Sequence, residues 1–210
     1  MADITRDKET VNQVGFWSAI FTALFIIIWV IVTAINMLIP LHFWVNFSAL
    51  LIAPSFVIMM ASIHASANQR SRIWAEIALA FSIIYTVIIA QNYFLQMTVV
   101  RQNPLAFEVL TMNPNQKDSV FWALEILGYG FMSLAALFVS LVFQKDGIEQ
   151  WIRWLFIANG FFAMTAAIVY VLTANPLHIV GLLSVGIWSI TFPAAAILLA
   201  ILFKRAERVE

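Results

Sequence analysis

The chain has 210 residues, of which 63% are hydrophobic and 10% are charged, and its formal net charge is zero. An ordinary soluble domain carries about 25% charged residues, so a surface this poor in charge suits lipid better than water. Nucleic acid is excluded as a partner, because binding it requires a basic face. The absence of cysteine excludes disulfides, thiolate metal sites and a cysteine nucleophile.

Six apolar stretches are long enough to cross a bilayer as helices, which takes about 20 residues each. These stretches are apolar on every face and lack the alternation of barrel strands. The sequence therefore predicts an all-α polytopic membrane protein, a six-transmembrane-helix bundle that forms a single domain over residues 15–203. The expected spans are about 15–39, 43–64, 73–100, 119–143, 151–173 and 176–203.

Polar segments flank this domain. Residues 1–14 form an N-terminal segment, and the apolar run after it is longer than the ~7–15 residues of a signal-peptide core, so we expect it to stay as the first span. Thr10 and Gln13 have the spacing of a capping box, which predicts that the first helix starts there. Asn175 followed by Pro176 predicts the start of the sixth helix. Residues 204–210 form a basic tail.

The positions of lysine and arginine predict the orientation. Nine of the eleven lie at the end of the bundle that holds both termini, whereas Arg101 and Lys117 lie at the other end. Basic residues are concentrated on the cytoplasmic side of membrane proteins, so both termini are expected in the cytoplasm. The expected location is the inner or plasma membrane of a prokaryote, as a multi-pass protein.

The longest link, residues 101–118, is then extracytoplasmic. It contains two Asn-Pro pairs around a short apolar segment. Two interpretations stay open, a connector that lies on the membrane surface and a lid that folds over the bundle.

Polar side chains within the spans gather toward the outer leaflet. A helix rises ~1.5 Å per residue, so Glu125 lies about 9 Å inside the fourth span. Asn92 and Gln96 lie about 12 and 6 Å inside the third span by the same rise, at levels that bracket Glu125. Because buried polar groups in membranes find partners, we expect these three side chains to be close together.

One interpretation of this asymmetry is a pocket open to the outside. Glu125 would be its only deep acid, either neutral and donating a hydrogen bond or ionised when a cation binds. The proposed ligand-binding residues are Tyr85, Asn92, Gln96, Glu125, Tyr129, Tyr170 and His178. Two alternatives stay open: Glu125, Asn92 and Gln96 simply bond one another and hold two helices together, or Glu125 is close enough to the interface to stay hydrated.

The preferred function is therefore to bind, sense or pass a small amphipathic or cationic ligand. The first alternative is a structural or accessory subunit of a larger membrane complex. The second alternative is an intramembrane enzyme that uses Glu125 and His178 on a lipid-like substrate. No phosphate-binding loop or serine-triad signature is present, so no catalytic residue, metal or cofactor is predicted. The expected partners are membrane lipids, a small-molecule ligand, and a partner membrane subunit or a second copy of the chain.

Overall fold

The computed structural model describes residues 2–102 and 119–208, with side chains from residue 8 to residue 207 within those ranges. The described residues are helical apart from short links and contain no strand. The helices are α1 (Ala2–Asn36), α2 (His42–Ser66), α3 (Arg72–Leu95), α5 (Val120–Ser140), α6 (Gly147–Thr173) and α7 (Ile179–Arg208), and α3 continues into a π-helix, η1 (Gln96–Val100).

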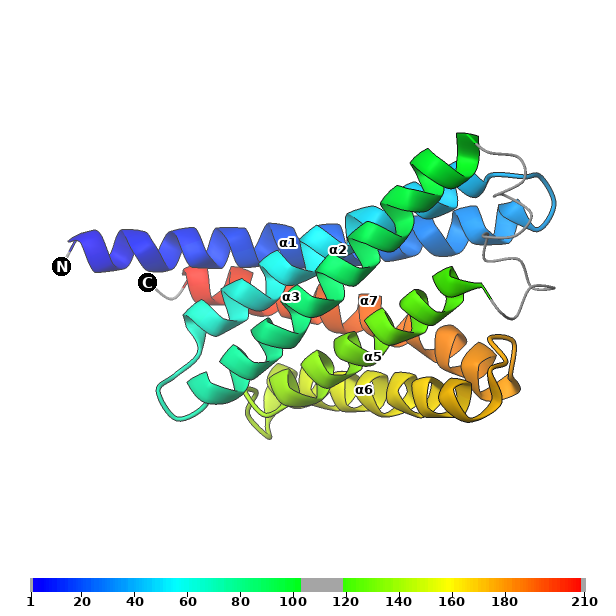
Figure 1. The fold of residues 1–210 in the computed structure, drawn as a ribbon. Coiled ribbons are helices and arrows are strands. Elements are labelled where there is room, and N and C mark those ends of the chain that lie inside the picture. The colour runs from blue at the N-terminus through cyan, green and yellow to red at the C-terminus, as the bar shows by residue number, and fades with distance from the viewer. Residues whose placement is uncertain (1, 103–118, 209–210) are drawn as a thin grey trace.

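The six long helices form a closed ring. Each helix packs against its neighbours in the chain, and α7 returns to pack against α1 (Figure 1). The two ends of the chain lie at the same end of the bundle, together with the links between α2 and α3 and between α5 and α6 (Figure 1). The opposite end carries the links between α1 and α2 and between α6 and α7.

All six helices are long and apolar enough to cross a membrane. The predicted spans are confirmed as helices of this kind, which is the architecture of a multi-pass membrane protein. Five tryptophans near the ends of the apolar stretches are exposed on the outside of the bundle, where the headgroup region favours such amphipathic rings. They are Trp17, Trp44, Trp74, Trp151 and Trp154.

Small residues set how closely the helices approach. A Cβ atom on Gly160 of α6 would lie 2.5 Å from Leu137 Cγ and 2.8 Å from the Ser133 carbonyl oxygen of α5. Polar side chains also join neighbouring helices: Thr86 donates to the Ala53 carbonyl at 3.2 Å, and Thr191 donates to Asn159 Oδ1 at 3.0 Å. Such contacts matter in lipid, because burial of apolar surface does not by itself drive helices together there.

Two predicted helix starts are wrong. Helix α1 begins at Ala2 rather than near Thr10, because the polar residues before the span contain no helix breaker and extend the helix. Helix α7 begins at Ile179, three residues after Pro176, because Asn175 Oδ1 accepts a hydrogen bond from the Leu177 amide at 3.2 Å and holds a turn there. Residues 103–118 lie outside the described residues. The two interpretations of this link, a surface connector and a lid, therefore both stay predictions.

Candidate functional site

Glu125 is bonded by two side chains of α3. Asn92 Nδ2 donates to Oε2 at 2.9 Å, and the Tyr93 hydroxyl donates to Oε1 at 2.5 Å. Glu125 is 8% exposed, which does not fit the hydrated carboxylate that the sequence left open. The carboxyl group therefore lies in the interface between α3 and α5, facing neither lipid nor water.

Two local features bring α3 and α5 together at this level. Ser119 caps α5 by accepting a hydrogen bond from the Phe121 amide at 3.3 Å, which places Glu125 in the second turn of the helix. Gly128, about one turn further along, has no side chain to separate the helices. A Cβ atom there would lie 2.7 Å from Ile89 Cδ1 on α3. The short Asn92 side chain can therefore reach Glu125.

The hydrogen bonds continue from Glu125 toward the end of α3. Gln96 Nε2 donates to Asn92 Oδ1 at 3.4 Å, and Asn92 Nδ2 also approaches the Phe121 carbonyl oxygen at 3.4 Å. Gln96 is the first residue of the π-helix η1, a type of turn that is common at functional sites. The Arg101 guanidinium, just past η1, lies 5.0 Å from the centre of the Phe43 ring and links this end of α3 to α2.

This arrangement contains the helix-joining contacts that the sequence suggested for Asn92, Gln96 and Glu125. Tyr93 is the member that sequence reasoning missed. On a regular helix it points about 100° away from Asn92, so helical periodicity does not place it on the same face. The line along which α3 touches α5 runs between Asn92 and Tyr93, so both side chains reach Glu125.

A row of aromatic rings crosses the bundle next to this cluster. Tyr129 follows Glu125 by one turn on α5, and its ring contacts Tyr85 of α3 at 5.8 Å between centroids. On its other side it contacts Trp188 of α7 at 5.4 Å, and Trp188 contacts Trp29 of α1 at 5.7 Å. Tyr85 in turn contacts Phe56 of α2 at 5.3 Å. We call these five residues the aromatic row.

Three members of the aromatic row have polar atoms without a hydrogen-bond partner among the described residues. They are the indole nitrogens of Trp29 and Trp188 and the hydroxyl of Tyr85, and the Thr33 hydroxyl, one turn from Trp29, is a fourth. Buried polar atoms are nearly always paired, and an indole N–H can only donate. The row therefore has an unused capacity to bind hydrogen-bond acceptors.

The space beside the row is small. A cavity of about 10 Å³ is lined by Tyr129, Ser133, Asn159 and Trp188, among others. That volume holds about one water molecule. Glu125 is not among the residues that line it. Anything larger must displace the rings of Tyr129 and Trp188.

The remaining proposed residues lie elsewhere in the bundle. Tyr170 is half-buried near the end of α6, and His178 is half-buried just before α7. His178 Nδ1 accepts a hydrogen bond from the Val180 amide at 3.3 Å, and no hydrogen bond joins it to Glu125 in the described ranges. Those ranges also contain no group of three side chains placed as metal ligands.

Comparison of the chain with protein-family models, with curated proteins and with solved structures gave no match.

Proposed function

We propose that this protein binds and senses a small amphipathic cation, which enters the bundle from the outer side of a plasma membrane of the prokaryotic type. Both termini would be in the cytoplasm. The distribution of lysine and arginine supports that orientation, because nine of the eleven belong to the end of the bundle that carries the termini.

The observation that carries the proposal is a buried carboxyl group held only by neutral donors. In the described part of the chain, no cationic side chain pairs with Glu125, whose oxygens are bonded by Asn92 and Tyr93. Ionisable residues within membrane spans are costly, and they mark ion and ligand sites. An ammonium group would supply the opposite charge that the protein itself does not place there.

The aromatic row would contact the part of the ligand other than its ammonium group. The ring faces of Tyr129 and Trp188 attract an apolar or cationic body, with cation–π contacts of roughly 0.5–2 kcal/mol each. An acceptor oxygen on the ligand would bond the Tyr85 hydroxyl and the Trp188 indole N–H, which have no other partner among the described residues. The ligand class is therefore a compact amine that also carries a hydroxyl or carbonyl oxygen.

Sensing fits this arrangement better than passage across the membrane. The aromatic row spans the interior from α1 to α2 by way of α7, α5 and α3, so it closes the bundle at this level. A ligand at Glu125 must turn the rings of Tyr129 and Trp188. Movement of those rings would alter the packing of α5 and α7, which carry the signal toward the cytoplasmic end.

The lack of cysteine allows a direct test. Ser133 is buried, lines the small cavity and is replaced by cysteine with little change in size. We would measure its reaction in intact cells with two methanethiosulfonate reagents, one bearing trimethylammonium and one bearing sulfonate. The matched control is Ser140→Cys, which is buried two turns further along the same helix.

The proposal predicts that Ser133→Cys reacts faster with the cationic reagent, that Glu125→Gln abolishes this preference, and that Ser140→Cys does not react. If Ser133→Cys is inert, or if it reacts without a charge preference, no cation path leads past Glu125 and the proposal is wrong.

A structural or accessory subunit is the second candidate. It is favoured by the use of polar side chains to join helices, as at Glu125 with Asn92 and at Thr191 with Asn159. This function requires a membrane partner at fixed stoichiometry when the chain is purified in mild detergent. A chain that purifies alone and binds a cation would contradict it.

A further inference from the structure

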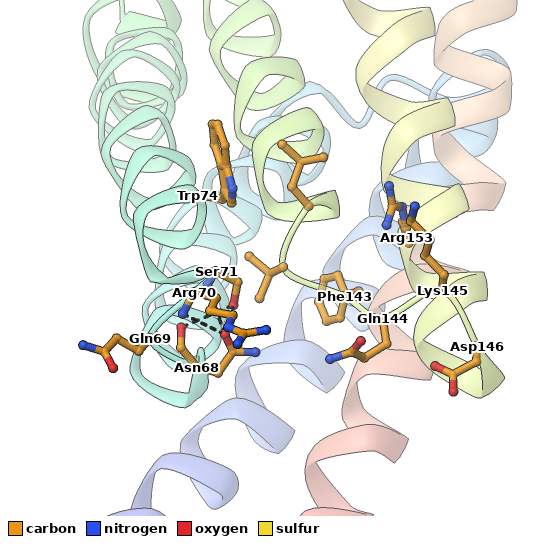
Figure 2. A pocket seen from close by; sticks show the side chains of 12 residues that line it. Asn68, Gln69, Arg70, Ser71, Trp74, Phe143, Gln144, Lys145, Asp146 and Arg153 are labelled. Atoms are coloured by element: carbon orange, nitrogen blue, oxygen red, sulfur yellow. Dashed lines mark hydrogen bonds between the residues drawn. The ribbon is translucent and has the colours of Figure 1, made fainter.

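A large groove opens at the end of the bundle that carries the termini. Its volume is about 920 Å³, and it lies between the link from α2 to α3 and the link from α5 to α6 (Figure 2). The site proposed above lies in the other half of the bundle. The groove is therefore separate from it and calls for its own explanation.

Positive charge dominates the groove. Three cationic side chains line it, Arg70, Lys145 and Arg153, against the single carboxylate of Asp146 (Figure 2). None of the three cations forms an ion pair with another residue of the described ranges. In those ranges, a salt bridge joins Lys204 to Glu207 instead. Arg153 is half-buried on α6, so its charge is partly withdrawn from water and needs an anion more than an exposed arginine would.

Part of the lining of the groove is apolar and exposed at the surface of the bundle. Trp74 and Leu141 both line the groove, and they are 37% and 42% exposed. Trp74 stacks on Phe138 of α5 at 6.0 Å between ring centroids, which fixes the wall between α3 and α5. The groove therefore has exposed apolar side chains beside its cationic ones.

We propose that this groove binds the phosphate group of an anionic phospholipid from the adjoining leaflet. Arg70, Lys145 and Arg153 bind the phosphate oxygens, and the first methylenes of an acyl chain lie along Trp74 and Leu141. Basic pockets between membrane helices on the cytoplasmic side are suited to anionic headgroups. The combination of cationic side chains with exposed apolar ones favours a lipid over a soluble phosphate, which would leave the apolar part of the groove unused.

The test uses the full chain in neutral detergent and three probes. These are dihexanoyl phosphatidylglycerol, dihexanoyl phosphatidylcholine, and glycerol 1-phosphate as the headgroup without chains. Thermal stabilisation is measured against the concentration of each probe. Binding of the phosphatidylglycerol probe alone is the expected result.

Arg153→Gln is then compared with Arg72→Gln. Arg72 is exposed at the same end of the bundle and does not line the groove. A basic residue near a membrane surface contributes roughly a five-fold change in binding. Arg153→Gln should therefore weaken binding of the phosphatidylglycerol probe by about that factor, whereas Arg72→Gln should leave its binding unchanged.

Equal stabilisation by the phosphatidylcholine probe would overturn the proposal, as would equal losses in the two variants. Binding of glycerol 1-phosphate as tight as that of the phosphatidylglycerol probe would also overturn it, because the site would then take a soluble phosphate.

Discussion

Replacing Glu125 alone with leucine should destabilise the bundle more than replacing Glu125 together with its two donors, Asn92 and Tyr93. Leucine leaves the Asn92 amide and the Tyr93 hydroxyl, which now donate at 2.9 and 2.5 Å, without their acceptor. A buried donor that loses its partner costs about 1–3 kcal/mol, so two of them cost roughly 2–6 kcal/mol. Replacing both partners with apolar groups of similar shape is close to neutral by comparison.

The assay is reversible unfolding in mixed micelles, with the free energy of unfolding measured for each variant. Glu125→Leu should lose more stability than the triple variant Glu125→Leu/Asn92→Leu/Tyr93→Phe. If the triple variant is the less stable of the two, the hydrogen bonds do not hold α3 to α5 in this way and the reasoning is refuted.

Two tyrosines on α3 provide a matched control. Tyr93→Phe removes a donor to Glu125 and should cost about 1 kcal/mol or more. Tyr85→Phe removes a hydroxyl that does not bond Glu125, so it should cost less stability than Tyr93→Phe. Equal losses in both variants would show that ring packing, not the Glu125 contact, determines the effect.

Three further predictions concern packing, a helix end and topology. Gly160→Ala should cost about 1–3 kcal/mol in the same unfolding assay, because its Cβ atom would overlap α5; Gly186→Ala, whose Cβ atom meets nothing within 4 Å, should instead be neutral or stabilising. Ala174 ends α6 with a φ of 47°, so Ala174→Gly should raise stability by about 1 kcal/mol, and a lower melting temperature would contradict this. In intact cells, Asn175→Cys should react with a membrane-impermeant thiol reagent and Asn68→Cys only after permeabilisation; the reverse pattern would invert the proposed orientation.

Hydropathy was sufficient to predict the six helices, because a bilayer requires long runs of apolar residues. It could not locate every helix end. Apolar content says nothing about whether a polar segment continues a helix, as residues 2–14 do in α1. At α7, the Asn175–Pro176 pair forms a turn before the helix rather than its first residues.

The sequence predicted how deep the polar cluster lies within the spans, but it predicted only some of the residues that belong to it. The helical rise placed Asn92, Gln96 and Glu125 at neighbouring levels, and the structure joins them by hydrogen bonds. Tyr93 was missed because the rotation of α3 against α5 depends on close packing at Gly128, which periodicity does not reveal. The roles of Tyr170 and His178 in ligand binding stay predictions.

The contacts of Trp188 could not be anticipated either. It lies on α7, and its neighbours Trp29 and Tyr129 come from α1 and α5. Only the closure of the ring, with α7 packed against α1, brings these three residues together. A single sequence gives the depth of each residue but not which helices are neighbours across the bundle.

The most direct measurement is a crystal structure of the chain grown from a lipid phase with phenylethanolamine, a compact amine that carries a hydroxyl group. The account predicts density for the amine against Glu125, with its hydroxyl within hydrogen-bonding distance of Tyr85 or Trp188 and with the ring of Tyr129 displaced. A map at saturating amine in which these side chains stay packed against one another, with no added density, would contradict it.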